Sequence, residues 1–394
     1  MIPYGKHHIE EDDIAAVVDV LRSGLITQGP AVEAFEHAVA QYVGARHAVA
    51  VSSGTAALHL AALAAGVGPG TTLITSPITF VASANAGLYA GGKVAFADID
   101  PETINMSPNA LASALEAHPD TKAVVPVHFA GLPCDMPAIK ALADKAGAAV
   151  IEDAAHALGA TYPDGRRVGC CANSLMTIFS FHPVKAIAAG EGGMITTNDD
   201  AVYRRLLRLR SHGINKLDDP FVFEGQAFTG DIQNPWYYEM QELGFHYRIS
   251  DIQCALGLSQ LGKLDAFMKR RRELVANYDA AFSGCEHCRP AQSDRIESSA
   301  HHLHVLRIKF KELDISRSEF MMRLRAEGIG TQVHYIPVPW HPVYRSIGAD
   351  PASCPRAVDF YAEALSIPLF VDLTDEEQAR VIQSIQSLVA RQRV

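Results

Sequence analysis

The sequence predicts an α/β protein in which helices cover a mostly parallel β-sheet. Two observations lead to this prediction. Short apolar runs alternate with segments of helical period from residue 47 to residue 197, and this alternation is typical of βαβ units. Chemically active residue types stand directly after several of these runs, and ligands of open α/β sheets bind beyond the carboxyl ends of the strands.

Each expected element has a reason in the sequence. Residues 12–23 and 30–43 space their apolar side chains every three or four positions, which predicts two opening helices. The expected strands are short and apolar: 47–51, 71–75, 93–99, 122–129, 148–153, 175–181 and 192–197. Helical spacing recurs between or after them at 54–66, 78–90, 108–117, 136–147 and 202–213.

The rest of the chain predicts a second unit. We expect a large domain over residues 1–245, including the N-terminal segment, and a smaller α+β domain over 246–394. The smaller domain would hold one long helix or two consecutive helices, then a strand and two more helices: 250–282, 302–310, 318–327 and 375–391. The segment 217–243 is aromatic-rich and has no clear period, so we expect a long functional loop or an interface.

Composition limits the possible functions. Of the 394 residues, 48% are hydrophobic, which is enough for a large buried core. The net charge is −10 without a long run of one sign, so general nucleic-acid binding is not expected. The sequence has no run of 18 apolar residues and no apolar secretory signal at its start. We therefore expect a cytoplasmic protein that does not enter a membrane.

The seven cysteines do not predict a disulfide-rich scaffold. One cluster raises the question of zinc, because Cys285 and Cys288 are followed by His301, His302 and His304. However, the segment HHLHVLRIKF alternates as a β-strand does, and zinc fingers usually place their histidines further apart. We therefore predict no metal site.

Four features at the expected strand ends suggest chemistry. The turn SSGTAAL contains Gly54, which permits close backbone approach, and the free N–H groups of the next helical turn attract phosphate. Asp153 ends a strand shortly before His156, although a carboxylate there often caps a helix. Ser180 ends another strand, where a local backbone hydrogen bond is its ordinary role. Lys185 follows an apolar run, although most lysines are simply solvated.

Together with the aromatic Phe80, these residues are the set that pyridoxal phosphate (PLP) requires. A lysine bonds to the aldehyde, an acid keeps the pyridine nitrogen protonated, and an aromatic face stacks on the ring. The small residues after Lys185 would leave room for the lysine to move. A Rossmann dehydrogenase would need G-x-G-x-x-G after its first strand, whereas GVGPG (66–70) follows a helix. A noncatalytic protein on this fold would not need the lysine, aspartate and serine together.

Motifs along nearly the whole chain add a family resemblance. In order, they are LITQGPAVEAFE, SSGTAALHLA, SPITFVASAN, DIDPETINM, EDAAHALGA, SFHPVK, GEGGMITT, YRISDIQCALGLSQL and GIGTQVHYIPV. This ordered set resembles the DegT/DnrJ/EryC1/StrS family of sugar aminotransferases. The resemblance implies the PLP-dependent transferase fold type I, which is aspartate aminotransferase-like, and a homodimer with active sites shared between the subunits.

The resemblance also implies roles for single residues. Lys185 would be the lysine that bonds to PLP, Asp153 would pair with the pyridine nitrogen, His156 would lie near the ring hydroxyl, and Phe80 would stack on the ring. The phosphate would be held by Gly54, Thr55 and Ser180. The sugar nucleotide would be approached by Tyr4, by Gly24, Leu25, Ile26 and Thr27, and by His334, Tyr335 and Ile336.

One position departs from the family pattern. Many relatives have asparagine before Tyr-Arg in the segment GFHYRIS, and that asparagine reaches the cofactor phosphate of the partner subunit. This chain has His246 there. A histidine can still donate the hydrogen bond, but it can also be a structural histidine.

Segments such as PVHFAGLPCDM, LRSHGI and PWYYEMQELG resemble the branch that acts in pseudaminic acid biosynthesis. The expected substrate is a UDP-linked 4-keto-6-deoxy-N-acetylhexosamine, and the expected amino donor is L-glutamate. The alternatives are a bacillosamine-type or perosamine-type aminotransferase and a PLP sugar dehydratase that does not transaminate. Dehydratases of the family replace the lysine by histidine, so Lys185 argues against the last alternative.

Overall fold

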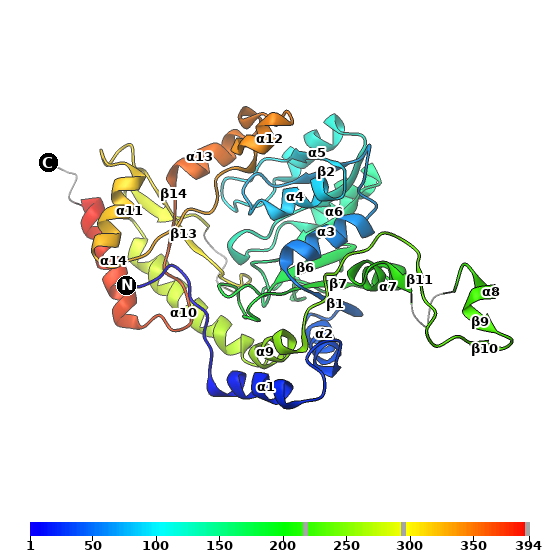
Figure 1. Ribbon diagram of the computed structural model, residues 1–394. Helices are drawn as coiled ribbons and strands as arrows, with labels where there is room; N and C mark the ends of the chain where they lie inside the picture. The colour runs from blue at the N-terminus through cyan, green and yellow to red at the C-terminus, as the bar shows by residue number, and fades with distance from the viewer. Residues whose placement is uncertain (216–219, 293–296, 391–394) are drawn as a thin grey trace.

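The computed structural model describes residues 1–215, 220–292 and 297–390. A seven-stranded sheet forms the centre of the larger part, in the order β1-β7-β6-β5-β4-β2-β3 (Figure 1). The strands are β1 (His47–Val51), β2 (Thr72–Thr75), β3 (Lys93–Phe96), β4 (Thr121–Val125), β5 (Ala149–Asp153), β6 (Met176–Ser180) and β7 (Gly193–Thr197). All neighbouring pairs are parallel except the two that include β7. The predicted fold class is confirmed.

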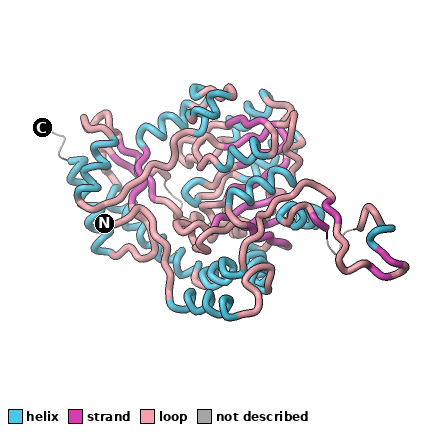
Figure 2. The backbone as a smooth tube through the Cα atoms, in the orientation of Figure 1, coloured by secondary structure: helices cyan, strands magenta, loops and turns pink. Residues whose placement is uncertain are grey.

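Helices cover both faces of this sheet (Figure 2). One face packs against α3 (Gly54–Ala64), α4 (Ala82–Tyr89) and α7 (Asp200–Arg210). The other packs against α2 (Pro30–Val43), α5 (Pro108–Ala117), α6 (Met136–Ala146) and α9 (Asp251–Leu261). Because successive strand residues point to opposite faces, Val49 and Val51 join the first layer while Ala48 and Ala50 join the second.

A smaller antiparallel sheet organises the C-terminal part. Its strands are β12 (Cys288–Pro290), β13 (His304–Ile308) and β14 (Ala364–Ile367). The other α-helices outside residues 220–243 are α1 (Glu11–Arg22), α10 (Leu264–Phe282), α11 (Arg317–Ala326), α12 (Pro342–Ser346), α13 (Pro355–Glu363) and α14 (Asp375–Ala390). The segment 250–282 thus forms two helices. The elements α12, α13 and β14 were not expected from the sequence, and residue 391 of the last expected helix lies outside the described residues.

The apolar clusters indicate how the chain divides. Ile249 and Cys254 pack with the large sheet, whereas Leu274 of α10 and the helices α11 and α14 pack around the small one. Ile2 also belongs to the cluster of the small sheet, and its N–H donates to the carbonyl of Gly328 at 2.8 Å. This packing favours a boundary between the two domains that lies inside α10. The division at residues 245 and 246 stays a prediction.

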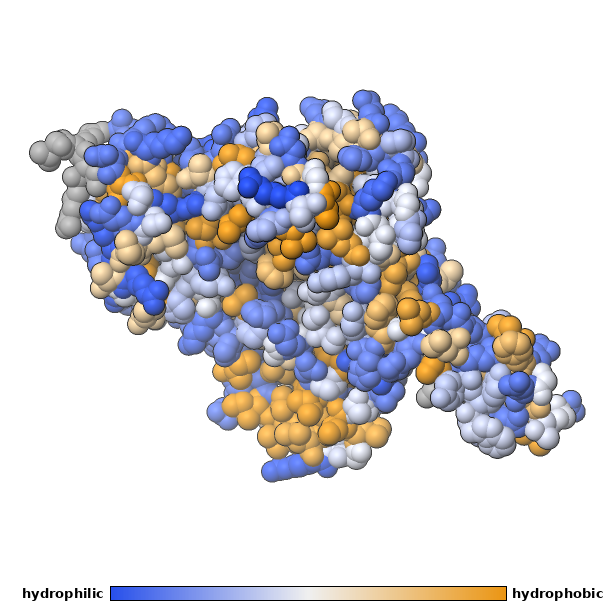
Figure 3. Space-filling model, turned by 45° about the horizontal axis from the view of Figure 1, so that its top comes forward, coloured by the Kyte–Doolittle hydropathy of each residue, from blue (hydrophilic) through white to orange (hydrophobic). Residues whose placement is uncertain are grey.

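Residues 220–243, here called the projecting segment, extend away from the body of the molecule (Figure 1). They contain α8 (Glu224–Ala227), β9 (Phe228–Thr229), β10 (Ile232–Gln233) and β11 (Glu239–Met240), which pairs with β8 (Ile214–Asn215). Residues 217–219 of the expected loop lie outside the described residues. Apolar side chains remain exposed on this segment and at the base of the body (Figure 3). On the segment, Ile232 is 72% exposed, and the aromatic residues Trp236 and Tyr238 are 75% and 57% exposed.

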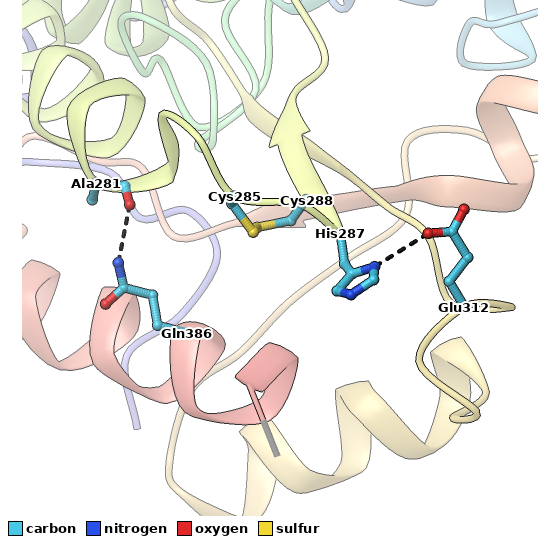
Figure 4. Close-up of a disulfide and its surroundings, with 6 residues drawn as sticks. All are labelled: Ala281, Cys285, His287, Cys288, Glu312 and Gln386. Atoms are coloured by element: carbon cyan, nitrogen blue, oxygen red, sulfur yellow. Dashed lines mark hydrogen bonds and ion pairs between the residues drawn. A yellow bond between two sulfur atoms is a disulfide. The ribbon is translucent and has the colours of Figure 1, made fainter. Parts of the chain in front are cut away.

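Cys285 and Cys288 form a disulfide beyond the end of α10 (Figure 4), a pairing that was not expected from the sequence. His287, which stands between them, bonds instead to Glu312 at 3.2 Å. The other five cysteines are free and buried. Among the described residues, no group of three or more His, Cys, Asp or Glu side chains is placed to hold a metal ion. None of the helices in these same ranges is long and apolar enough to cross a membrane.

Candidate active site

A cavity of about 430 Å³ opens at the carboxyl edge of the large sheet. Its walls come from the strand ends of β1, β5 and β6, from the start of α3, and from segments that belong to the small sheet or pack against it. The predicted site residues that line it are Tyr4, Gly54, Thr55, Phe80, Asp153, His156, Ser180, Lys185, His334 and Tyr335. Residues that are far apart in the sequence therefore meet where a parallel sheet places its ligand.

The start of α3 forms one end of the cavity. Ser53 caps this helix by accepting a hydrogen bond from the N–H of Ala56 at 3.1 Å. Within the described residues, the N–H groups of Gly54 and Thr55 have no hydrogen-bond partner. A Cβ atom on Gly54 would lie 2.9 Å from the Cβ of Ser180, so only glycine allows this approach. Open N–H groups at the start of an 11-residue helix attract an anion such as phosphate.

The reversed strand β7 explains a glycine in this arrangement. Because β7 runs against its neighbours, its first residue, Gly193, lies beside Val51 and Ser180 at the carboxyl edge. A Cβ atom on Gly193 would lie 2.4 Å from the carbonyl oxygen of Ser53. This glycine therefore lets α3 begin close to Ser180. The small residues after Lys185 were expected only to leave room for the lysine to move. The packing role of Gly193 was not expected from the sequence.

A buried carboxylate forms the floor of the cavity. Asp153, at the end of β5, is 5% exposed. Its Oδ2 accepts a hydrogen bond from the hydroxyl of Ser83 at 2.6 Å, and its Oδ1 accepts one from the N–H of Ala155 at 3.1 Å. The hydroxyl of Ser83 is in turn 2.7 Å from that of Thr79. These contacts fix the orientation of the carboxylate.

Lys185 lies in the turn that joins β6 to β7. Its backbone N–H donates to the carbonyl of His182 at 2.8 Å, and the N–H of Ala189 closes the turn on Phe181 at 2.9 Å. Burial lowers the pKa of Lys185 to about 8, against the opposing attraction of Asp153. A lysine with such a pKa loses its proton readily and can act as a nucleophile or a base near neutral pH.

This lowered pKa predicts a change in stability. In the cofactor-free protein, Lys185→Met should raise the free energy of unfolding at pH 7 by about 2 kcal/mol, allowing for water in the cavity. The folded pKa of about 8 lies below the usual 10.5, so between these values the unfolded chain holds a proton that the folded chain has lost. The cost of burying the charge is therefore full below pH 8 and disappears as the pH approaches 10.5. Urea unfolding at several pH values measures this difference.

A constant advantage across that pH range, or no advantage at pH 7, would contradict the pKa argument. Lys140→Met is the matched control, because Lys140 is exposed on α6 and pairs with Asp144 at the surface.

Histidines and a tyrosine form another part of the cavity wall. The ring of His156 is 6% exposed, and its Nε2 is 3.1 Å from the hydroxyl of Tyr335. Burial, and secondarily Lys185, lowers the pKa of His156 well below its usual range. The same two causes lower the pKa of His334 to about 4, and its Nδ1 is 2.8 Å from the hydroxyl of Ser366. The histidine rings on this wall are therefore neutral at pH 7.

Six predicted site residues do not line the cavity within a single chain: Gly24, Leu25, Ile26, Thr27, His246 and Ile336. Leu25 and Ile26 are 55% and 51% exposed beside the start of α9, where the carbonyl of Ile26 accepts from the N–H of Asp251. His246 pairs with Ser211 in a β-bridge, and its ring lies 5.4 Å from that of His212.

Six polar residues line the cavity that were not among the predicted site residues: Ser53, Thr79, Ser83, His182, Glu191 and His302. His182 and Glu191 flank the Lys185 turn, so their position near the predicted lysine was a usable signal. Ser83 lies on the first turn of α4, where neither spacing nor composition indicated a site. His302 lies just before β13, and its spacing after Cys285 and Cys288 had raised only the question of zinc.

An anion site at a helix start, a buried carboxylate and a lysine of lowered pKa, all at the carboxyl edge of a mostly parallel sheet, define a PLP enzyme of fold type I. The model of the DegT/DnrJ/EryC1/StrS aminotransferase family matches residues 7–386. The chain belongs to this family and is a PLP-dependent nucleotide-sugar aminotransferase.

Individual relatives agree over nearly the full length. The spore coat polysaccharide biosynthesis protein SpsC of Bacillus subtilis is 41% identical over 98% of this chain and 97% of its own. Helicobacter pylori PseC, an aminotransferase involved in the biosynthesis of pseudoaminic acid, is 29% identical with a TM-score of 0.88 and covers 99% of both chains. The PLP-form of the sugar aminotransferase Spr1654 from Streptococcus pneumoniae has 29% identity and a TM-score of 0.87, and covers 100% of both chains.

The residues of this cavity fit PLP. The volume of about 430 Å³ suits a cofactor of this size together with part of a substrate. The open N–H groups of Gly54 and Thr55 match a phosphate, and the Asp153 carboxylate matches a protonated ring nitrogen. Within the described residues, the buried Nδ1 of His156 has no hydrogen-bond partner. A polar group of a bound cofactor can supply one. Phe80, 60% exposed, offers an aromatic face.

Proposed function

We propose that this cavity binds PLP through the residues predicted from the sequence and that Lys185 is its covalent partner. The observation that carries the proposal is the amino group of Lys185, whose pKa is lowered to about 8, in one cavity with Asp153 and the open start of α3. Gly54, Thr55 and Ser180 would hold the phosphate.

The bound cofactor would act as an electron sink for the reacting carbon. Residues of the chain would orient the cofactor and move protons. The carboxylate of Asp153 would hold the proton on the pyridine nitrogen, Phe80 would cover the ring, and His156 would lie beside its hydroxyl. The Nζ atom of Lys185 would move a proton to and from the reacting carbon of the substrate. Tyr4, His334 and Tyr335 would limit access of water to that carbon.

For the substrate we propose a UDP-linked 4-keto-6-deoxy-N-acetylhexosamine, aminated at C4 with L-glutamate as donor, for pseudaminic acid biosynthesis. The segments quoted above and the similarity to PseC support this proposal. The greater identity to SpsC supports the alternative of a different nucleotide 4-keto sugar used for a polysaccharide. The nucleotide would supply binding energy away from the reacting carbon, which helps to orient the ketone.

An assay with two keto-sugars separates these alternatives. The enzyme, PLP and L-glutamate are incubated with the keto-sugars made by an inverting and by a retaining 4,6-dehydratase, and products are analysed by mass and by NMR. Preference for the L-arabino keto-sugar supports the pseudaminic acid proposal. Preference for the D-xylo isomer would move the protein to a bacillosamine-type role, and failure with both would contradict the proposed substrate class.

We also propose a cytoplasmic homodimer with active sites shared between the subunits. Leu25, Ile26 and Ile336 are half-exposed apolar residues that were predicted to approach the sugar nucleotide, and a second subunit would cover them. Trp236 and Tyr238 on the projecting segment are exposed too and would pack against the partner or over the nucleotide. His246 would reach the phosphate of the partner's cofactor.

Subunit mixing tests the shared site. Lys185→Ala and His246→Ala homodimers should each have little activity, and mixing them should restore part of it. A mixed dimer would contain one site without either substitution, because each site takes Lys185 from one chain and His246 from the other. No recovery, despite subunit exchange demonstrated by native mass spectrometry, would favour a structural role for His246.

A further inference from the structure

Two buried imidazoles meet at the inner wall of the cavity. The rings of His156 and His302 lie 4.3 Å apart between centroids, at an angle of 36°. Each residue is 6% exposed and both line the cavity. Within the described residues, neither Nδ1 atom has a hydrogen-bond partner. The two rings therefore meet by packing and not through a hydrogen bond of either Nδ1 atom. Within the described residues, the Nδ1 atom of His156 remains available to a ligand.

His302 reaches this wall on a segment that is tied to the large domain. The N–H of His302 donates to the carbonyl of Ala130 at 2.9 Å, and the N–H of Ala300 donates to that of Gly131 at 3.1 Å. Gly131 has φ +103°, and a Cβ atom there would lie 2.8 Å from the N–H nitrogen of His301 and 3.0 Å from the carbonyl oxygen of His156. A glycine is therefore required for the two histidine segments to come together.

The buried side chain of Arg271 forms hydrogen bonds with the backbone of the same segment. The Nη1 of Arg271 donates to the carbonyls of His301 at 3.1 Å and Leu369 at 3.3 Å. Its side chain is buried, and within the described part of the chain its Nη1 atom bonds to backbone carbonyls and to no carboxylate. Burial lowers the pKa of Arg271 to about 10, so it stays charged at pH 7. Because a buried charge is costly without hydrogen bonds, these bonds hold Arg271 against the backbone of this segment.

We propose that His302 is a positioning residue for the reaction: its ring, fixed by Arg271 and by the contacts at Gly131, packs on His156 and holds that imidazole against Tyr335, out of water. The inference rests on the proposed function only in taking His156 to contact the bound cofactor. The packing between the rings does not depend on that role.

The surroundings of His156 give the proposal a measurable consequence. The groups that face His156 are Tyr335, Lys185, His334 and His302, with the charges of Asp153 and Arg271 beyond them. Burial is the main cause that keeps the pKa of His156 well below 6.5. Removing the ring of His302 would admit water, so the pKa of His156 should return toward 6.5.

The test uses His302→Ala and His302→Phe, because phenylalanine keeps the packing ring and loses only the nitrogens. In the cofactor-free protein, histidine labelled at 13Cε1 reports the titration of His156, whose signal is assigned by its loss in His156→Gln. We expect His156 to titrate well below pH 6.5 in the wild-type and His302→Phe proteins, and its titration to move back toward pH 6.5 in His302→Ala. His304→Ala, a buried histidine of the same segment outside the cavity, is the control.

The same variants are then assayed as holoenzymes. We expect kcat to fall about tenfold in His302→Ala, to stay near wild type in His302→Phe, and His302→Ala to have no further effect in a His156→Ala background. An equal loss in His302→Phe, an additive effect in the double variant, or an unchanged His156 titration in His302→Ala would overturn the proposal. A His156→Ala enzyme with normal kcat would instead refute the proposed role of His156, and the NMR titration would still decide whether His302 holds it.

Discussion

Lys185→Ala should abolish turnover and leave the fold intact. We expect kcat to fall by about 10³-fold or more, because the variant lacks both the covalent attachment point and the group that moves the proton. The fold should survive because the side chain faces a cavity, and removing it leaves no new void in the core. Turnover with L-glutamate and the preferred keto-sugar gives the activity, and circular dichroism with urea unfolding gives the state of the fold.

Lys140→Ala is the control for this experiment, because Lys140 lies on the surface of α6, away from the cavity. It should retain full turnover. Substantial turnover in folded, cofactor-saturated Lys185→Ala would mean that another group acts in place of this lysine.

Asp153→Asn should reduce kcat by about 10²- to 10⁴-fold, as the loss of other positioned acid–base groups does. The change is nearly isosteric. The amide oxygen can still accept from the N–H of Ala155, and the amide NH₂ can donate to Ser83, whose hydroxyl can turn toward Thr79. The substitution therefore removes the charge that keeps a pyridine nitrogen protonated and little else.

Ser83→Ala tests the hydrogen bond to Asp153 separately from the charge of its carboxylate. This variant keeps the carboxylate and loses one hydrogen bond to it, so we expect a smaller loss, on the order of tenfold. Turnover and the absorbance of the bound cofactor are measured for both variants. Near-normal turnover in Asp153→Asn, or a larger loss in Ser83→Ala, would count against the assigned role of Asp153.

The sequence predicted the residues that follow strands. Gly54, Asp153, Ser180 and Lys185 stand after short apolar runs, and the carboxyl ends of parallel strands meet at one edge whatever their order in the sheet. Their convergence in one cavity therefore needed only the fold class. The order itself was not predictable, because insertion of the reversed strand β7 between β1 and β6 depends on tertiary pairing.

Residues that reach the cavity from other elements were missed. Ser83 lies among small residues on a helix, and nothing in ASANAG distinguishes a hydroxyl that bonds to a distant carboxylate. His302 belongs to a segment that alternates like a strand, but β13 begins only at His304, which leaves His302 free to turn toward His156. The strand β14 follows α13 without a turn residue, so its four apolar or small residues could not be separated from the helix.

Identification of the lysine that carries the cofactor is the most direct test of the central claim, that this cavity is the PLP site of the chain. The purified holoenzyme is reduced with borohydride, digested, and mapped by mass spectrometry. The account predicts a pyridoxyl group on the peptide that contains Lys185 and on no other lysine peptide. A label on a different lysine, in protein whose visible absorbance disappears on reduction, would contradict it.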